Sequence, residues 1–486
     1  MTATVGLQDI LLITPLIIIF LAGCLPITIK AIIGREQAPL FSMLQAISGL
    51  FIATVWVAMG GDTSAFNDKL VIDGLSAASQ PIILFLTAGA LFLSYENINT
   101  RGAQFSEYVF LIMGSAVGMM TLTWANDLLI AFIGLETMSL ALYVLIAMSH
   151  EQTLAKEASF KYFILGGFSS AILMYGVAFL YGTVGSTMLP ELAAKTPGLI
   201  AGNKLFVIGY MLLIVGFCFK VSIFPFHNWT PDVYQGAPTP VSSFMATAVK
   251  IAAFVAFLRI FLTEGLNQSE LIMNLLQWLA VATMLVGNIA AIMQDNLKRM
   301  LAYSSVAHSG YAFVALIVTA SGGYVSGSSS LVFYLLTYAF MNLGAFGVIA
   351  LFEKHEETMV NVEDLRGLGY KRPALAASFA IFMLSLAGLP PTAGFFGKFY
   401  VFSAAVSEGL VWLAVWGVIN SVISVYYYLR PIVVMYMTEG DAPEATRGDV
   451  LSKAAIAFSV LMVIAIGLAA HPFFDAIHVS VMNVFD

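Results

Sequence analysis

Long apolar runs recur along this chain and constrain its fold more than any other feature. A run of about 20 residues spans the hydrocarbon core of a bilayer as an α-helix. The runs lack the alternation of polar and apolar residues that membrane β-strands require. Only 10% of the 486 residues are charged, against about 25% in soluble domains. We therefore predict an all-α polytopic membrane protein, because helices satisfy their own backbone hydrogen bonds in lipid.

The apolar runs divide into about 14 predicted transmembrane helices. Their approximate positions are 9–31, 40–60, 77–96, 106–124, 127–149, 157–184, 203–225, 239–262, 270–294, 298–319, 328–352, 373–408, 411–437 and 453–471. The run at 373–408 is too long for one span and too short for two spans with a loop.

The lysines and arginines between these runs predict the orientation, because basic residues are enriched in cytoplasmic loops. One set of loops holds Lys30, Arg35, Arg101, Lys156, Lys161, Lys298, Arg299, Lys354, Arg366, Lys371, Arg372, Arg430, Arg447 and Lys453. The opposite set holds only Lys69, Lys195, Lys204 and, near a helix end, Arg259. The basic side is therefore predicted to be cytoplasmic, with both termini on the outer side.

Four charged residues in the predicted spans belong to no loop: Glu136, Lys220, Lys250 and Lys398. A charge at mid-bilayer costs about 2.5–3.5 kcal/mol on insertion scales, so such residues face protein or a hydrated path. Structural ion pairs between helices are the alternative interpretation. Three cations and one anion cannot all pair with each other, however, so we predict a proton relay.

Two of these lysines lie beside predicted breaks in a helix. Lys220 is followed by Pro225, and Lys398 follows Pro390 and Pro391 in the stretch AGLPPTAGFFGKF. Proline interrupts a helix and leaves carbonyl groups without partners, which protein or water must satisfy. Discontinuous helices beside buried charges are typical of ion paths in secondary transporters.

The spacing of these residues indicates an inverted repeat. Lys398 follows Lys220 by 178 residues, and His308 follows Glu136 by 172 residues. Both pairs lie five spans apart, and an odd offset inverts the second copy. His308 is the candidate relay group of the second copy, since histidine titrates near neutral pH. The predicted units are an N-terminal three-helix extension at 1–104, a first repeat at 105–265, an inverted second repeat at 266–440, and a C-terminal helix at 441–486.

Other polar residues near the breaks leave alternatives open. His227 and Asp232 could form the cytoplasmic mouth of a path or a plain polar loop. Of Tyr426, Tyr427 and Tyr428, we expect at least two to belong to an interfacial belt of aromatic residues.

No cofactor or metal motif is present. The two cysteines, Cys24 and Cys218, lie in separate segments, and there is no Walker motif and no GxGxxG after a strand pattern. Any redox cofactor of a machine that includes this chain would be bound by other subunits.

Several motifs closely resemble the antiporter-like subunits of proton-pumping NADH:quinone oxidoreductase, respiratory complex I. They include GLETMSL, FKVSIFPFHNWTPDVYQGAPTPVSSFMATAVKIA, NLKRMLAYSSVAHSGY, MLSLAGLPPTAGFFGKFYVF and SVYYYLR. The family is similar to the Mrp-type antiporter subunits and shares their antiporter-like fold of two inverted five-helix repeats. The residue on the second broken helix is lysine in the branch of the family called subunit N and glutamate in subunit M. With Lys398, the chain resembles the subunit N branch.

The resemblance implies a role for each matched residue. Glu136 would pair with Lys220, Lys250 would be the central relay, His308 would lie in the second half-channel, and Lys398 would lead to the exit. It also implies a bacterial inner membrane location, with subunit M, the small subunit K, the lateral helix of subunit L and lipids as neighbours, and no nucleic acid. NADH, FMN, iron–sulfur clusters and quinone would be bound by other subunits of the complex.

Three alternatives remain at this point. The chain could belong to a multi-subunit cation/proton antiporter, or it could be a structural spacer that moves no protons. It could also belong to the plastoquinone-linked relative of complex I. The complete set of Glu136, Lys220, Lys250 and Lys398 favours proton translocation over a spacer role.

Overall fold

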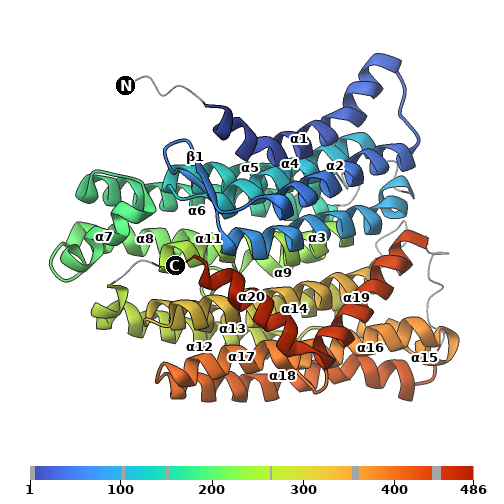
Figure 1. Ribbon diagram of the computed structural model, residues 1–486. Helices are drawn as coiled ribbons and strands as arrows, with labels where there is room; N and C mark the ends of the chain where they lie inside the picture. The colour runs from blue at the N-terminus through green and yellow to red at the C-terminus, as the bar shows by residue number, and fades with distance from the viewer. Residues whose placement is uncertain are drawn as a thin grey trace.

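The fold is a bundle of helices whose long axes run in broadly the same direction (Figure 1). This computed structural model describes residues 6–100, 104–148, 153–262, 265–352, 361–440 and 450–484, without the side chains of 96 and 98–100. Three residues used to predict the orientation, Arg101, Lys354 and Arg447, lie outside the described residues.

Within the described residues, 12 helical segments are long and apolar enough to cross a membrane. Eleven are α1 (Leu7–Ile33), α2 (Pro39–Met59), α3 (Gly74–Thr100), α4 (Phe105–Trp124), α5 (Leu128–Ala147), α6 (Thr153–Val184), α12 (Glu270–Ile292), α13 (Leu297–Ala320), α14 (Tyr324–Ala350), α18 (Val411–Met437) and α19 (Val450–Leu468). The twelfth joins α10 (Thr239–Phe244), a π-helical turn η1 (Met245–Val249) and α11 (Lys250–Phe261).

The other two predicted spans are broken, at the positions that the prolines indicated. α8 (Lys204–Lys220) ends at its lysine, and α9 (Trp229–Gly236) follows after an irregular stretch. α16 (Pro373–Ala387) and α17 (Ala393–Ser407) flank the second break. Gly388 ends α16 in the left-handed region, with φ of 85°, where a side chain would be strained. The 12 continuous spans and two broken ones match the 14 predicted segments.

Shorter elements cover the ends of the bundle. They are a hairpin of β1 (Thr63–Ala65) and β2 (Leu70–Ile72), with Ser64 opposite Val71, the helices α7 (Leu189–Leu199) and α15 (Leu368–Lys371), and the 3-10 turns η2 (Leu266–Gln268) and η3 (Val362–Leu365).

The chain ends in two helices, where the sequence predicted one. α20 (Ala470–Met482) follows α19 and lies across α14 and α3 (Figure 1). Its Phe474 stacks on Tyr400 of α17 with ring centroids 3.9 Å apart, and the Ser480 hydroxyl donates to the Gly74 carbonyl at 2.8 Å. α20 was missed because its hydrophobic pattern is amphipathic and too short for a span.

Matching helix pairs in the two halves pack unusually closely through glycine. A Cβ on Gly118 of α4 would lie 2.4 Å from the Met138 amide nitrogen of α5. A Cβ on Gly287 of α12 would lie 2.5 Å from the Ala307 amide nitrogen of α13. Small residues allow such backbone contact between membrane helices. These pairs are the first two helices of each predicted repeat, so the packing agrees with the antiporter-like architecture.

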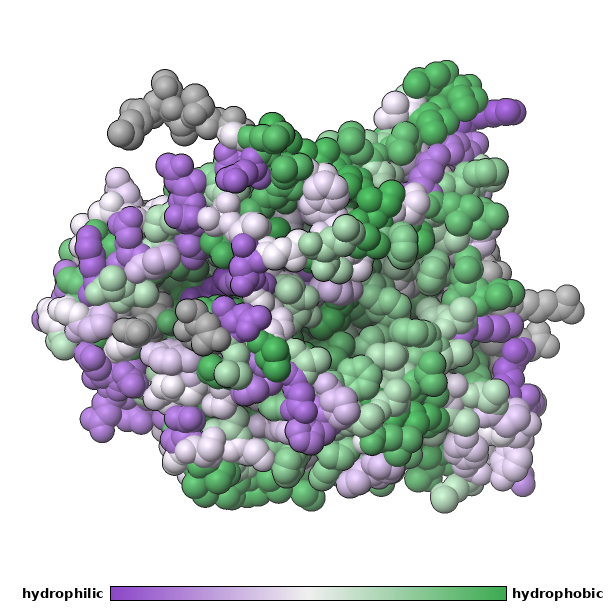
Figure 2. All heavy atoms as spheres, viewed as in Figure 1, coloured by the Kyte–Doolittle hydropathy of each residue, from purple (hydrophilic) through white to green (hydrophobic). Residues whose placement is uncertain are grey.

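The exterior of the spans is apolar, as lipid contact requires. Figure 2 shows hydrophobic residues over the middle of the visible face and hydrophilic residues toward its left and right ends. The interior contains a buried ion pair that was not predicted, although Arg259 was counted among the basic residues of the outer side, near a helix end. Arg259 of α11 donates through Nη1 and Nη2 to the Asp73 carboxylate at 2.7 and 2.8 Å, and through Nε to the Thr123 carbonyl at 2.8 Å.

Lys298 is a second residue that the sequence placed in a loop but the structure buries. It lies in the first turn of α13, is 6% exposed, and donates to the Ala237 carbonyl at 2.6 Å. Basic residues at helix ends thus anchor the bundle and do not all mark loops.

Candidate functional site

The first cluster of the site forms where α8 ends against α5. Lys220, the last residue of α8, is 2% exposed, and its amine donates to the Ser139 hydroxyl at 2.7 Å. Glu136 lies one turn before Ser139, is partly buried, and accepts a hydrogen bond from the Ser170 hydroxyl. Glu136 is near enough to interact electrostatically with Lys220. Ser139, rather than Glu136, is the direct partner of the Lys220 amine.

Aromatic rings surround the amine of Lys220. The amine lies 5.3 Å from the ring centroid of Tyr162, 5.9 Å from that of Tyr143 and 6.0 Å from that of Phe219. The negative face of an aromatic ring attracts a cation within about 6 Å. The pocket can therefore hold the protonated amine without a direct carboxylate partner.

The second cluster lies at Lys250, deep in the bundle. The π-helical turn η1 immediately precedes Lys250, which is 2% exposed and begins α11. Its amine donates to the Ser305 carbonyl and to the Ser309 hydroxyl of α13, both at 2.7 Å. The Tyr338 hydroxyl of α14 donates to the Ser305 hydroxyl at 2.8 Å. Single-turn π-helices are frequent at functional sites, and this one was not predicted from the sequence.

His308 lies on the same helix as both partners of Lys250. Its ring is 2% exposed, with Nδ1 2.6 Å from the Tyr334 hydroxyl and Nε2 3.0 Å from the Tyr428 hydroxyl. Ser305 and Ser309 precede and follow His308 by three residues and one residue along α13. α13 thus joins the central lysine to a histidine that has hydroxyl groups on both ring nitrogens.

The tyrosines of α18 correct one prediction. Tyr426 is 63% exposed and fits an interfacial position, but Tyr427 and Tyr428 are 1% and 0% exposed. Two of the three therefore lie in the interior, and the expected belt of at least two is wrong. The physical reason is that consecutive residues on a helix point in different directions, so only one of the three faces outward.

The third cluster lies at the second break, around Lys398 of α17. The break after Gly388 leaves the last carbonyls of α16 without partners in the helix, and Lys398 donates to those of Leu386 and Ala387 at 3.1 and 3.0 Å. A third hydrogen bond goes to the Ser421 hydroxyl at 2.9 Å. The broken helix thus supplies the acceptors that a buried amine needs.

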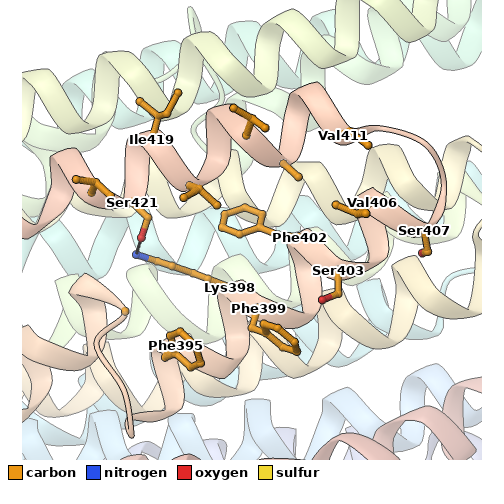
Figure 3. Close-up of a pocket in the computed structure, with 15 residues that line it drawn as sticks. Phe395, Lys398, Phe399, Phe402, Ser403, Val406, Ser407, Val411, Ile419 and Ser421 are labelled. Atoms are coloured by element: carbon orange, nitrogen blue, oxygen red, sulfur yellow. Dashed lines mark hydrogen bonds between the residues drawn. The ribbon is translucent and has the colours of Figure 1, made fainter.

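A surface cavity of about 770 Å³ extends from Lys398 along the seam between α17 and α18 (Figure 3). Its walls are mostly apolar and include Phe395, Phe402 and Ile419. In Figure 3 the Lys398 side chain reaches the Ser421 hydroxyl at the inner end of the cavity, and Val411 lies at the far end.

Asn288 connects the cluster of Lys398 to that of His308. The Lys398 amine lies 5.0 Å from the ring centroid of Tyr311. The Asn288 amide donates to the Tyr311 hydroxyl at 3.3 Å and accepts from the Tyr427 hydroxyl at 3.0 Å. The rings of Tyr427 and Tyr428 are tilted against each other with centroids 4.3 Å apart, beside His308. Polar and aromatic contacts therefore run from Lys398 to His308 without interruption.

The structure brings His308, Lys250 and Lys398 together around α13, with Lys220 and Glu136 in a separate cluster of the first half. Sequence reasoning missed the residues that connect them. They are Ser139, Ser305, Ser309, Tyr311, Tyr334, Tyr338, Asn288 and Ser421. The sequence did contain a signal for some of these partners, because hydroxyl-bearing residues surround His308 in the stretch SSVAHSGY.

His227 and Asp232 differ in their surroundings. Asp232 of α9 accepts from Lys161 of α6 at 2.8 Å and from Arg299 of α13 at 2.7 Å, so it links the first break to the second half. His227 is 5% exposed, and its Nδ1 has no partner among the described residues. Among those residues, no group of three or more His, Cys, Asp or Glu could hold a metal ion.

Comparison with known proteins identifies the family of the chain. Residues 125–424 match the family model described as NADH:quinone oxidoreductase/Mrp antiporter, TM. The chain is 52% identical to NADH-quinone oxidoreductase subunit N of Bdellovibrio bacteriovorus, over 99% of this chain and 100% of that protein. It belongs to the subunit N family of NADH-quinone oxidoreductase.

Other members of the subunit N family and its structural neighbours extend the likeness. Subunit N of Trichlorobacter lovleyi is 42% identical, over 88% of both chains. A chain of respiratory complex I from Thermus thermophilus with bound aureothin superposes with a TM-score of 0.82 and 32% identity, over 95% of this chain and 99% of that one. A chain of the Mrp complex from Dietzia sp. gives a TM-score of 0.84 at 19% identity, over 99% and 98%, which shows the shared fold alone.

Proposed function

We propose that this chain is a proton-translocating membrane-arm subunit of NADH:quinone oxidoreductase. The observation that carries the proposal is the line of buried titratable side chains, Lys220, Lys250, His308 and Lys398, each at most 4% exposed. Glu136 adds a carboxylate at one end of the line. Burying several cations has a free-energy cost, which a spacer helix bundle would avoid with apolar residues.

The chemistry of these groups suits proton transfer. An ammonium group of lysine releases a proton to a neighbouring acceptor and becomes a neutral amine that can take up the next proton. His308 has a hydroxyl group on each ring nitrogen, so it can receive a proton on one side and release one on the other. Each transfer makes and breaks only N–H and O–H bonds. Glu136 attracts a proton into the cluster of Lys220, and Lys398 is the group nearest the second break.

The redox half of the reaction is assigned to other subunits. In this proposal NADH, FMN, iron–sulfur clusters and quinone are bound elsewhere in the complex, and electron transfer there changes the protonation of this chain through its neighbours. Subunit M, subunit K and the lateral helix of subunit L are the proposed neighbours. The basic loops support insertion in a bacterial inner membrane with both termini on the periplasmic side.

A subunit of a cation/proton antiporter is the second candidate, because the Mrp chain shares the fold over nearly its whole length. The two candidates differ in their partners. Purification through a tag on this chain should bring flavin and iron–sulfur subunits with it. Their complete absence from an otherwise intact membrane complex would favour the antiporter.

The test of the proposal replaces the central lysine. Lys250→Met keeps the apolar stem and removes the amine, so the chain should assemble normally. NADH-driven acidification in membrane vesicles should fall by at least tenfold, since positioned proton-transfer groups contribute about 10²–10⁴-fold. Lys250→Arg should not restore the rate, because arginine does not release its proton. Lys453→Met, at an exposed lysine, is the control. Full pumping by an assembled Lys250→Met variant would contradict the proposal.

A further inference from the structure

α9, the short helix that follows the first break, is bound to the second half of the chain. The Asp232 carboxylate of α9 accepts a hydrogen bond from Arg299 of α13, with Oδ1 and Nη1 2.7 Å apart. The same Nη1 donates to the Gln235 side-chain carbonyl at 2.9 Å, and the Lys298 amine donates to the Ala237 carbonyl at 2.6 Å. Two consecutive basic residues of α13 thus hold α9 from its middle to its end, and these contacts together form the α9–α13 link.

The Asp232 carboxylate also contacts the first half of the chain. Its other oxygen, Oδ2, accepts a hydrogen bond from the Lys161 amine of α6 at 2.8 Å. The side chains of Asp232, Lys161 and Arg299 are 34%, 39% and 27% exposed. Ion pairs that water reaches contribute little to stability. A carboxylate with one oxygen on each cation does, however, fix the position of α6 and α13 relative to α9, which is a geometric role.

At its other end, α9 contacts the break itself. The Trp229 N–H donates to the Phe219 carbonyl of α8 at 3.0 Å, and the Thr230 hydroxyl donates to the Ser222 hydroxyl at 2.8 Å. Ser222 lies in the left-handed region, with φ of 63°, two residues after Lys220 ends α8. A rearrangement of the backbone beside Lys220 would therefore move the start of α9.

Arg299 lies on the helix that supplies both hydrogen-bond partners of Lys250. α13 is one continuous helix, and Ser305 follows Arg299 by six residues, or about 9 Å along the axis. The Lys250 amine donates to the Ser305 carbonyl and to the Ser309 hydroxyl, both at 2.7 Å. A displacement of α13 by about 1 Å would lengthen such a contact beyond a hydrogen bond. Small movements of α13 can therefore make or break the hydrogen bonds of the central lysine.

The half-helix after the second break offers no carboxylate for a similar contact. Its sequence, AGFFGKFYVFSAAVS, contains Lys398 as its only charged residue. Lys398 donates to the carbonyls of Leu386 and Ala387 before the break and to the Ser421 hydroxyl of α18. The carboxylate that connects a broken helix to α13 therefore belongs to the first break.

We propose that Asp232 and Arg299 are positioning residues that transmit a change at the first break to α13 and so set the hydrogen bonds of Lys250. The inference rests on the proposed function. When Lys220 gains or loses its proton, the backbone at the break rearranges and α9 moves. Because Arg299 holds α9, α13 follows, and the Lys250 amine gains or loses the Ser305 carbonyl. No proton passes through Asp232, which stays a carboxylate.

The experiment uses the intact complex in native membrane vesicles and measures NADH-driven acidification per assembled complex. Asp232→Asn and Arg299→Gln each remove one charge of the link. Each should slow acidification at least about twofold, the lower end of the effect of residues that couple two sites. The double variant should be no slower than the slower single variant, because both changes remove the same contact. Asp232→Glu keeps the carboxylate and should recover most of the rate.

Lys161→Met is the matched control. It removes the other cation beside the same carboxylate but leaves the contact with α13, so the rate per complex should stay at the wild-type level. Lys298→Met provides a second approach if Asp232→Asn fails to assemble, because it removes the contact with the Ala237 carbonyl and should also slow acidification. A purely structural role for the link would lower the amount of complex and leave the rate of each complex unchanged.

The outcomes separate the two proposals. If Lys250→Met abolishes pumping while the variants of the α9–α13 link pump like Lys161→Met, the coupling is wrong and the proposed function stands. If Lys250→Met itself pumps at the full rate, the proposed function is wrong. If Asp232→Asn slows pumping but Arg299→Gln does not, Asp232 acts alone as a proton-collecting group, and the coupling is again wrong. Slower pumping confined to the variants that break the link supports the coupling.

Discussion

The buried ion pair of Asp73 and Arg259 gives a prediction whose size follows from its contacts. Asp73→Asn keeps the shape of the side chain but removes the charge opposite a guanidinium whose side chain is 7% exposed. The Arg259 guanidinium then keeps its hydrogen bonds to the Thr123 carbonyl and the Ser76 hydroxyl, but it has no carboxylate to balance its charge. Breaking one side of a buried pair costs about 3–5 kcal/mol, because the other charge is left uncompensated.

This cost translates into a measurable thermal shift. Unfolding entropy of about 2.1 cal/mol/K per residue makes each kcal/mol worth about 1 °C for a chain of 486 residues. Asp73→Asn should therefore lower the temperature at which half of the chain is unfolded, its thermal midpoint, by about 3–5 °C. The assay heats membranes, extracts them in mild detergent, and measures how much of the tagged chain stays soluble at each temperature.

The double variant Asp73→Asn/Arg259→Met supplies the control, because it removes both charges. Replacing a whole buried pair is often neutral or stabilising, so its midpoint should lie above that of Asp73→Asn. If the double variant were the less stable of the two, the reasoning from an uncompensated charge would be refuted.

The same pair predicts a dependence on pH. Burial alone would raise the pKa of Asp73, but the charge and hydrogen bonds of Arg259 outweigh it and hold that pKa below its usual value. The stabilisation is therefore present above the pKa of an unfolded aspartate, about 3.9, and is lost as pH falls through the lower folded value. The thermal midpoint of the wild-type chain should therefore decrease when the pH is lowered below about 4. The double variant has no carboxylate at position 73, so its thermal midpoint should lack this part of the decrease.

Two further predictions concern single residues. Glu136→Gln keeps an acceptor for Ser170 but removes the carboxylate near Lys220, so the chain should assemble while NADH-driven acidification drops; an unchanged rate would show that the charge is dispensable. Gly118→Val should reduce the amount of folded chain in membranes, since overpacking costs about 1–3 kcal/mol and its Cβ would meet the Met138 amide at 2.4 Å. A Cβ on Gly114 of the same helix would meet nothing within 4 Å, so Gly114→Val should accumulate normally.

The spans and breaks of the fold could be predicted from the sequence because lipid imposes strong local rules. Hydrophobic length identified the helices, and Pro225, Pro390 and Pro391 indicated where two of them break. The π-helical turn before Lys250 and the helix α20 were not predictable in this way. The turn packs against both α14 and α3, which are distant in the sequence, and α20 has a surface pattern that resembles a loop helix or an amphipathic tail.

The lysines of the site were predictable for a physical reason, namely the cost of a charge in a span. Their partners were not, because serine and tyrosine are common in membrane helices and have low cost there. The expectation that at least two of Tyr426, Tyr427 and Tyr428 form a belt was wrong because an aromatic residue near a helix end suits a belt and an interior position equally well. Only the packing of α18 against α13 places the Tyr428 hydroxyl on His308.

The glycine contacts between α4 and α5, and between α12 and α13, have a mechanical consequence. Helices whose backbones are in contact cannot slide past each other without a steric clash, so each pair moves as one rigid unit. The two broken helices lack a continuous hydrogen-bond ladder and are the compliant parts of the molecule. Strain applied from a neighbouring subunit would therefore concentrate at the breaks beside Lys220 and Lys398. The two helices within each glycine-packed pair would keep their distance from each other.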